Sequence, residues 1–403
     1  MSGPPADGDH RLDEAGLAHH DRHWRLLNSL GLGKRAARSL QVSPENRFLL
    51  ACSGTDVSPQ RIQALITQDL DWQQILDRAR DYGIAPLLYF HLKKSAQEQH
   101  TPPETLHQLR LLYRESCVQA VNQSVRLQEI LLALSHKGVS PIVMKGAALG
   151  ALIYRNAGLR PMLDIDLLVR SSDLDAAAST LAELGYVSDE SYQAAEWYKN
   201  NHHHLAPFVT PDRSVVVELH HQVASPRANV CIPIEEFWQH ARRAQIASVS
   251  ALVLAPEDLL LGICTHVAIS RRFEKALRDL VDIDEVIRAY GNEIDWNQLV
   301  RNSMSWGTAS CLYYCLWAAQ LFTETALPPH LLEKLRPETG ISIPEDACLK
   351  FLIPRAIFPD LTRMKAWLIN DLIGEVLCPQ VGITAILTGR LREYFGLTSP
   401  QTS

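Results

Sequence analysis

The chain has little that would direct it to a membrane or to a long nucleic acid. No apolar run in its 403 residues approaches the roughly 18 residues that cross a bilayer. The first residues, MSGPPADGDHRLDEAG, have no basic segment leading into an apolar one, so we expect no secretory signal and no membrane partner. Lys and Arg number 39 against 45 Asp and Glu, a net charge of −6. Proteins that bind bulk nucleic acid are usually basic, and such a partner is therefore not expected.

Cysteine pairs at the spacing of redox or zinc motifs are also missing. Eight cysteines are scattered along the chain, at positions 52, 117, 231, 264, 311, 315, 348 and 378. Cys311 and Cys315 stand four residues apart in an apolar segment, a helical spacing. We interpret the cysteines as reduced thiols in the core and predict a cytoplasmic protein.

Composition places the chain among ordinary globular proteins, with 46% hydrophobic and 21% charged residues. Its length favours two or three structural units. Patterning divides it into a disordered tail over residues 1–22, a helical region over 23–135, a core over 136–225, a helical region over 226–396 and a frayed tail over 397–403. The clearest predicted helices of the first helical region cover residues 59–68, 71–82, 85–94 and 103–134.

The central stretch from Val139 to Arg170 carries the strongest pattern. A short apolar run, 139–144, predicts a buried strand, and residues 147–154 predict a helix. Residues 164–169 then predict a second strand, which opens with Asp164 and Asp166. Because side chains alternate across a strand, these two carboxylates point to the same face. They would repel unless protonated, paired or bridged by a cation, and carboxylate oxygens suit Mg²⁺.

A third carboxylate follows within the same α/β unit. Residues 174–184 predict a helix, Tyr186-Val187 a short strand, 191–200 another helix, and 203–210 and 214–223 two further strands. Glu218 lies inside the last strand among valine and leucine. A buried unpaired acid is costly, which marks Glu218 as a candidate ligand.

Strand, Gly-containing turn, helix and a strand bearing Asp-x-Asp resemble the nucleotidyltransferase fold of the DNA polymerase beta superfamily. KGAALGALIY followed by LRPMLDIDLLV looks more narrowly like a group of uncharacterised bacterial nucleotidyltransferase-like proteins. The resemblance is specific over about 140–225. It is looser in the flanks, at Asp71-Trp72, at ARDYGIAP over 79–86 and at Asp295-Trp296. It implies an α+β fold, with a small mixed-sheet nucleotidyltransferase core between helical regions.

The resemblance also implies a chemistry. Asp164, Asp166 and Glu218 would be the catalytic carboxylates and would hold two divalent ions, Mg²⁺ or Mn²⁺. The substrate would be an NTP, attacked in line at its α-phosphorus with release of pyrophosphate. Lys145, Gly146 and Arg160 would bind the nucleotide. Here Lys-Gly-Ala replaces the usual Gly-Gly or Gly-Ser turn, and the third acid is Glu in place of the more common Asp.

Structural interpretations stand beside several of these assignments. Lys145 is equally well explained as an ion-pair partner of Asp164 or Asp166, and Arg160 as a solvated loop residue. We expect His220 at the rim of the site. For the run over residues 202–204 we expect no metal site, because adjacent histidines on a strand point to opposite faces. Asp282-Ile-Asp284 repeats the Asp-x-Asp spelling in a helical pattern and predicts a solvated face.

The acceptor stays open. It would be a hydroxyl-type group on a small molecule, a peptide or a protein, and the end of a tRNA is also compatible with the sequence. Two alternatives to such an enzyme are a catalytically weak nucleotide-binding or scaffold protein and a toxin-like nucleotidyltransferase.

Overall fold

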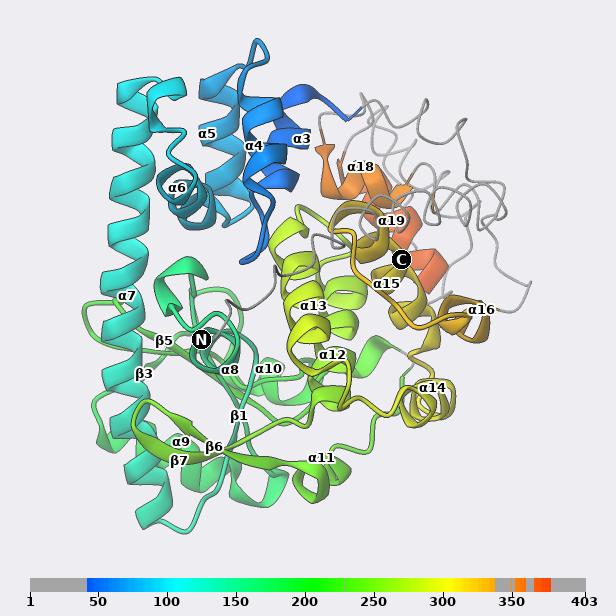
Figure 1. Cartoon of the computed structure of the whole chain (residues 1–403). Coiled ribbons are helices and arrows are strands. Elements are labelled where there is room, and N and C mark those ends of the chain that lie inside the picture. Colours follow the sequence, from blue (N-terminus) through cyan, green and yellow to red (C-terminus); the bar gives the residue numbers. More distant parts are fainter. Residues whose placement is uncertain (1–41, 229, 338–348, 350–351, 360–365, 378–403) are drawn as a thin grey trace, which may run out of the picture. The chain divides into compact units, whose positions relative to one another are not determined.

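The computed structural model describes residues 42–228, 230–337, 349, 352–359 and 366–377. The described residues form an α+β fold in which one mixed sheet is combined with many helices, as predicted (Figure 1). The helices and strands that the structure describes belong to one compact unit that begins at Ser43. The tails expected at 1–22 and 397–403 lie outside the described residues.

The sheet has seven strands in the order β3-β4-β5-β2-β1-β7-β6. Their bounds are β1 (Ile142–Val143), β2 (Ile165–Leu168), β3 (Val187–Ser188), β4 (Phe208–Val209), β5 (Val216–His220), β6 (Arg242–Ile246) and β7 (Val249–Val253). Strand β2 runs parallel to β5, and β1 runs parallel to β7. The other neighbouring pairs are antiparallel.

The last two strands extend the sheet beyond the expected boundary at residue 225. They pair antiparallel over five residue pairs, and β7 places Leu252 beside Ile142 of β1. Ala247 and Ser248 connect them, with φ of 50° and 64°. A two-residue turn with two positive φ angles is usually marked by Asn or Gly. Because that signal is absent here, the sequence pattern missed the hairpin.

The N-terminal helices match the predicted ones closely. They are α3 (Pro44–Ala51), α4 (Pro59–Ile66), α5 (Trp72–Asp81), α6 (Ala85–Lys94) and α7 (Pro103–His136). Helix α7 contacts α5 and α6 with its first part and α9 and β7 further on, so it joins the helical region to the sheet. Its end is set by Gly138, whose φ of +77° favours glycine, and Val139 N–H donates to the carbonyl of Leu134.

Of the remaining described helices, those from α8 to α11 lie between strands in the chain, and those from α12 onward follow the last strand. They are α8 (Lys145–Leu152), α9 (Leu174–Glu183), α10 (Ala195–Asn201), α11 (Glu235–His240), α12 (Pro256–Thr265), α13 (Leu277–Tyr290), α14 (Trp296–Ser305), α15 (Ala309–Phe322), α16 (Leu331–Leu335), α18 (Ile353–Ile357) and α19 (Ala366–Leu377). A π-helical segment, His266–Ser270, continues α12. Short 3₁₀ turns cover Glu98–His100, Ala157–Leu159, Ser171–Asp173 and Pro226–Ala228.

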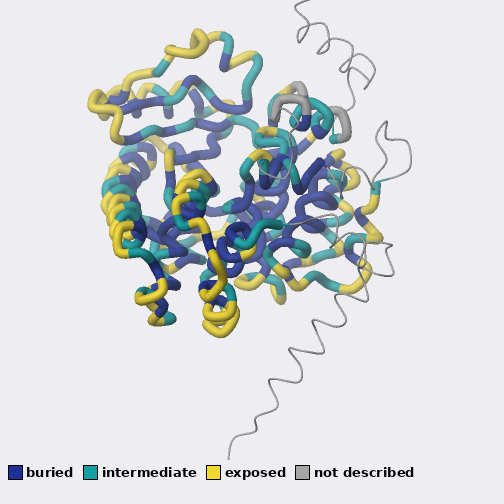
Figure 2. The backbone as a smooth tube through the Cα atoms, turned by 90° about the horizontal axis from the view of Figure 1, so that it is seen from above, coloured by how far each residue is buried: buried dark blue, intermediate teal, exposed yellow. Residues whose placement is uncertain are grey.

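Two hydrophobic cores meet at the sheet. The larger core includes α12, α13 and α15, whose residues are mostly buried, and reaches one face of the sheet at Ile142 and Leu168. Figure 2 shows buried residues in the interior of the described chain and exposed ones mainly on its outer turns. The smaller core packs Val143 and Leu167, on the other face, against α7 and α9. Side chains alternate across a strand, so the residues next to Leu167 in β2 face the larger helical core.

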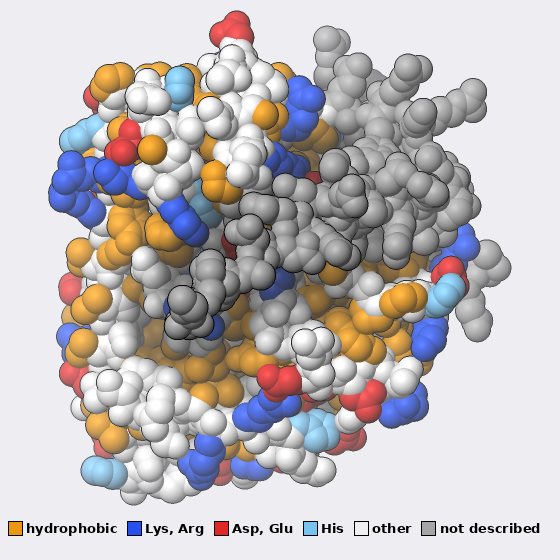
Figure 3. Space-filling model, viewed as in Figure 1, with side chains coloured by type: hydrophobic (Ala, Val, Ile, Leu, Met, Phe, Trp, Pro, Cys, Tyr) orange, Lys and Arg blue, Asp and Glu red, His pale blue; other side chains and the backbone are white. Residues whose placement is uncertain are grey.

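Lys and Arg side chains are scattered among acidic and apolar ones on the face shown in Figure 3. Among the described residues, no helix combines the length and the apolar character that a membrane span requires.

Candidate active site

Strands β2 and β5 bring two of the predicted carboxylates side by side. Their parallel register pairs Asp166 with Glu218, and Asp164 directly precedes β2. The apolar neighbours Ile165 and Leu167 are fully buried in the smaller core. Asp166 and Glu218 therefore project from the opposite face, toward the helices. The juxtaposition expected from the sequence is present.

Asp166 is the most enclosed of the three acids, with 4% of its surface exposed. Its Oδ1 accepts hydrogen bonds from Lys145 Nζ at 3.1 Å and from His220 Nε2 at 2.7 Å. Burial alone would raise the pKa of Asp166, but Lys145 and His220 hold it well below its ordinary value. Asp166 is therefore an anion with two cationic or proton-donating partners.

Asp164 behaves in the opposite way. Burial and the negative charges of Asp166 and Glu218 raise its pKa to about 7, against which the charge of Lys145 acts only partly. Three carboxylates at one place thus carry more negative charge than the adjacent side chains neutralise. Such a cluster favours either a retained proton or an added cation.

Glu218 is held by histidines. Its Oε2 lies 3.2 Å from His220 Nε2 and 3.5 Å from His204 Nε2. Although burial acts to raise the pKa of Glu218, the hydrogen bond with His220 and the charge of His204 lower it overall. Asp166, Glu218 and His220 each offer one ligand atom, and these atoms lie within 4.8 Å of one another. This group could hold a metal ion.

Lys145 lies at the turn that connects β1 to α8. Its φ of 39° is in the left-handed region that favours glycine, so a lysine there is conformationally strained. Burial acts to lower its pKa, but Asp166, Glu218 and Asp164 raise it overall. The interpretation of Lys145 as an ion-pair partner of Asp166 is confirmed. Nucleotide binding by Lys145 stays a prediction.

Gly146 has a packing role. A Cβ at this position would lie 2.7 Å from Arg160 Nη1 and 3.0 Å from Met162 Cγ. Glycine is therefore needed for the approach of Arg160, whatever its contact with phosphate. The structure does not test the predicted contact of Gly146 with a nucleotide.

Arg160 is not a solvated loop residue, and this interpretation is wrong. It is 7% exposed, and its Nε and Nη2 donate to the two oxygens of Asp282 at 2.8 and 2.6 Å. Tyr154 adds a hydrogen bond to Asp282 at 2.7 Å. Two of the three guanidinium nitrogens are thus committed to Asp282, which leaves Nη1 beside Gly146 for the predicted nucleotide contact.

Asp282 and Asp284 do not form a solvated face. They are 1% and 2% exposed. The helical pattern of α13 was predicted, but both faces of this helix pack against protein, and each acid has a basic partner. The amphipathic interpretation assumed that charged side chains face water, which fails for a helix enclosed on all sides.

Two expectations about histidines are also wrong. His220 is 1% exposed and lies between Asp166 and Glu218, so it is at the base of the site and not at its rim. The segment over residues 202–204 is not a strand: β4 begins only at Phe208. Its three side chains therefore do not alternate, and their ligand atoms lie within 4.8 Å of one another.

Two further histidines lie near the carboxylates: His204, which sequence reasoning did not place there, and His266, which it assigned to a helix that could cover the nucleotide pocket. His204 contacts Glu218, as described above, and the triple-histidine run was its only signal. His266 opens the π-helical segment after α12, and burial and the charge of Lys145 lower its pKa to about 3, against the charge of Asp166. The π-helical turn therefore lies within electrostatic reach of the carboxylates. Such turns are frequent at functional sites.

Comparison with known families identifies one match. The family model described as "Uncharacterised nucleotidyltransferase" matches residues 68–324, which span the whole sheet and helices on both sides of it. The match includes both Asp-Trp pairs of the flanks, where Asp71 and Asp295 cap the N-termini of α5 and α14. Searches of curated proteins and of solved structures found no match.

Proposed function

The chain belongs to the uncharacterised nucleotidyltransferase family, and we propose that it transfers a nucleoside monophosphate from an NTP to a hydroxyl-type acceptor. The observation that carries this proposal is the pairing of Asp166 with Glu218 across two parallel strands, with Asp164 beside them. This arrangement also supports membership of the DNA polymerase beta superfamily, in which paired strands carry the catalytic acids.

The donor set fits a hard divalent cation. Burial, followed by the negative charges of Asp166 and Glu218, raises the pKa of Asp164 to about 7, so an added cation would be favoured beside these carboxylates. Asp164, Asp166 and Glu218 would hold Mg²⁺ or Mn²⁺ in a two-metal arrangement. When bound, the ions would neutralise the charge of the triphosphate and make the acceptor hydroxyl more acidic.

The chain's own groups would bind and orient the substrates. The N–H groups at the start of α8, which has no side-chain cap, and the Lys145 ammonium would bind phosphate oxygens. Glu218 would accept the proton of the acceptor hydroxyl while the hydroxyl oxygen bonds to the α-phosphorus. The bond from the α-phosphorus to the bridging oxygen then breaks, and pyrophosphate leaves. His220, which contacts both Asp166 and Glu218, would keep these carboxylates aligned.

The acceptor is proposed to be a small molecule, a peptide or a protein. The net charge of −6 and the scattered basic side chains on the face in Figure 3 favour these over long nucleic acid.

A nucleotide-binding protein with weak turnover is the second candidate. The Lys145-Gly146-Ala147 turn has no hydroxyl for a phosphate contact, and Lys145 already pairs with Asp166. Release of pyrophosphate in the presence of acceptors distinguishes the two candidates, because only the enzyme would produce it.

Calorimetric titration with the four NTPs and Mg²⁺ tests the proposal on wild type and on the double variant Asp164→Ala, Asp166→Ala. We expect binding that needs both the ion and the aspartates, followed by pyrophosphate release when acceptors are screened. Absence of NTP binding to wild type with either Mg²⁺ or Mn²⁺ would overturn it.

A further inference from the structure

Histidines gather beside the carboxylates on the β4 side of β5. The rings of His202 and His203 stack with centroids 4.2 Å apart, and those of His202 and His204 are 4.1 Å apart. His203 and His204 also contact the ring of His220, at 5.3 and 5.1 Å. Four imidazoles thus lie together, with Glu218 the carboxylate in contact with two of them.

The backbone holds this histidine run firmly on β5. His204 forms a bridge with His220. The carbonyl of His203 accepts hydrogen bonds from the N–H groups of His221 and Gln222, at 3.0 and 3.1 Å. The rings therefore have a defined position relative to Glu218 and are not part of a loose loop.

His204 has the orientation of a metal ligand. Its Nδ1 lies 2.6 Å from the carbonyl oxygen of Leu205, which requires a proton on Nδ1. Its Nε2, which lies 3.5 Å from Glu218 Oε2, can then carry a proton or bind a metal ion. Either cation offsets the charge of Glu218, and a backbone carbonyl on the far nitrogen typically orients a ligating histidine.

The neighbouring rings have unsatisfied nitrogens. Nδ1 of His202 and Nδ1 of His203 are buried without a hydrogen-bond partner in the described structure. His203 is 8% exposed, so water does not readily compensate the loss.

We propose that His202, His203 and His204 bind one divalent transition ion of the Zn²⁺ type. The three histidine ligand atoms already lie within 4.8 Å of one another. Imidazole nitrogens suit Zn²⁺ and related ions, whereas Mg²⁺ prefers oxygen. This site is separate from the carboxylate cluster in its chemistry, and it does not depend on the proposed nucleotidyl transfer.

Such an ion would hold the segment after α10 against β5. Because His204 lies 3.5 Å from Glu218 of β5, fixing its ring would also limit the positions open to this carboxylate, the partner of Asp166 in the sheet register. The histidine site would therefore position a residue of the candidate active site without contacting the nucleotide itself.

Metal binding to the full-length protein tests the proposal. The metal-free protein is titrated with Co²⁺, whose absorption spectrum reports tetrahedral coordination, and with Zn²⁺ in a thermal unfolding assay. All proteins carry four further substitutions, because histidines of the N-terminal segment could bind added metal themselves. These are His10→Asn, His19→Asn, His20→Asn and His23→Asn. We expect one equivalent of Co²⁺ with a tetrahedral spectrum, and a rise of Tm with Zn²⁺.

Variants then locate the ion. His203→Gln and His204→Gln should each weaken binding about 100-fold or more, since even loss of an outer partner costs 10- to 100-fold. His221→Gln is the matched control, a neighbouring histidine outside the group of three, and should bind like the parent protein. Asp164→Asn should also retain Co²⁺, which separates this site from the magnesium site.

Two results would overturn the proposal. One is equal Co²⁺ binding by the parent protein and both histidine variants. The other is a parent protein that shows neither a tetrahedral spectrum nor a Zn²⁺-dependent change of Tm. Because the second result needs no variant, misfolding of a substituted protein cannot obscure the outcome.

Discussion

Two segments of this chain have the same three residues, but their carboxylates have different surroundings. Asp164-Ile-Asp166 opens a strand, and Asp282-Ile-Asp284 lies on helix α13. In the first segment, Asp166 pairs with Glu218 of the neighbouring strand, and the charges of both act on Asp164. In the helix, the acids diverge: Asp282 pairs with Arg160, and Asp284 pairs with Arg288 at 2.6 Å.

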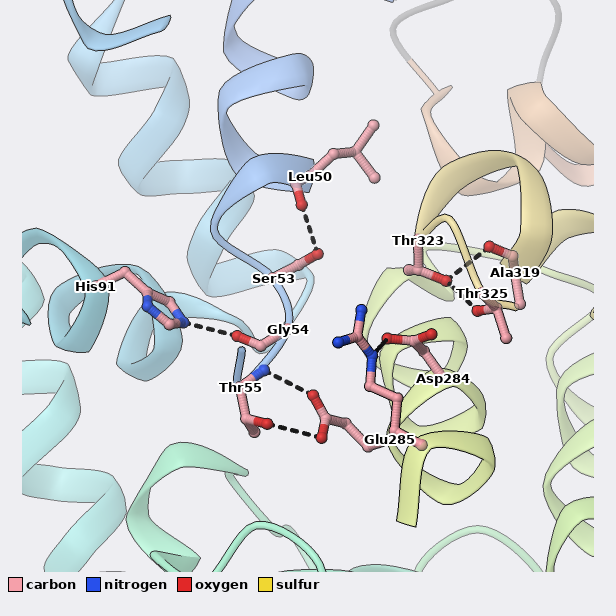
Figure 4. A network of polar contacts seen from close by, with 11 residues as sticks. Leu50, Ser53, Gly54, Thr55, His91, Asp284, Glu285, Ala319, Thr323 and Thr325 are labelled. Atoms are coloured by element: carbon pink, nitrogen blue, oxygen red, sulfur yellow. Dashed lines mark hydrogen bonds and ion pairs between the residues drawn. The ribbon is translucent and has the colours of Figure 1, made fainter. Parts of the chain in front are cut away.

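The next acid of α13 follows the same rule. Both oxygens of Glu285 accept hydrogen bonds from Thr55, from its N–H at 2.6 Å and from its hydroxyl at 2.7 Å (Figure 4). Asp284 and Glu285 thus point to different neighbours in the same view. Each acid of the helix has its own partner, whereas the acids of the strand share theirs. Carboxylates that share partners keep an uncompensated negative charge that can bind a cation. Carboxylates that each have a partner are neutralised, and their pairing affects only the stability of the fold.

The largest effect is expected when the strand loses a carboxylate. Asp166→Asn should lower nucleotidyl transfer about 10⁴-fold, since metal-ion catalysis supplies several kcal/mol. Asp284→Asn is the matched control in the second Asp-Ile-Asp and should leave turnover unchanged. Single-turnover release of pyrophosphate measures both. Equal losses in the two variants would contradict the distinction between the segments.

A smaller but still large effect is expected on stability when the helix loses a carboxylate. Asp282→Ala leaves the Arg160 guanidinium buried without its partner, which should lower the free energy of unfolding by about 3–5 kcal/mol. Urea unfolding measures the change. The double variant Asp282→Leu, Arg160→Met should lose less than the single one. If the single variant is as stable as wild type, the pair is not the structural element described here.

The strand cluster should also respond to pH. The folded pKa of Asp164 is about 7, above its unfolded value near 3.9, so the folded protein binds more protons between these values. Stability of the metal-free protein should therefore fall, by roughly 1–3 kcal/mol, as the pH rises through this window. Asp166 and Glu218 have lowered pKa values and the opposite sign, and they act at lower pH.

Denaturant unfolding in a chelator at several pH values measures this dependence. Asp164→Asn should remove the fall, and Mg²⁺ should reverse it in wild type. A fall of the same size in Asp164→Asn would assign the titration to another group.

The smallest effect is expected at Thr55, the hydrogen-bond partner of Glu285 on α13. Thr55→Val removes the hydroxyl bond to Glu285 and keeps the N–H bond, so it should cost about 1–2 kcal/mol of unfolding free energy. Thr55→Ser keeps the hydroxyl and should be close to wild type. Thermal unfolding of the two variants side by side measures the difference, and equal values for Val and Ser would show that the hydroxyl contributes nothing.

Local pattern was enough to find most helices and the central strands. Apolar positions at helical spacing predicted α7 within two residues of its observed end, and alternation placed Asp166 and Glu218 in strands. The hairpin of β6 and β7 was missed because its turn residues, Ala247 and Ser248, are not typical of such turns. The histidine run was assigned to a strand, but that strand begins several residues later, at Phe208.

The sequence by itself determined which elements form and which face of each strand carries the acids, because these depend on the periods of helix and strand. Only the tertiary structure decided which charges have partners. Arg160 belongs with Asp282, 122 residues away, and Asp166 with Lys145 and His220. The pairing of Arg160 with Asp282 leaves no mark in local spacing, and the sequence left open whether Lys145 pairs with Asp164 or Asp166, since an ion pair depends on distance in space and on burial. The same Asp-Ile-Asp therefore became a candidate cation site in one place and a structural ion-pair network in the other.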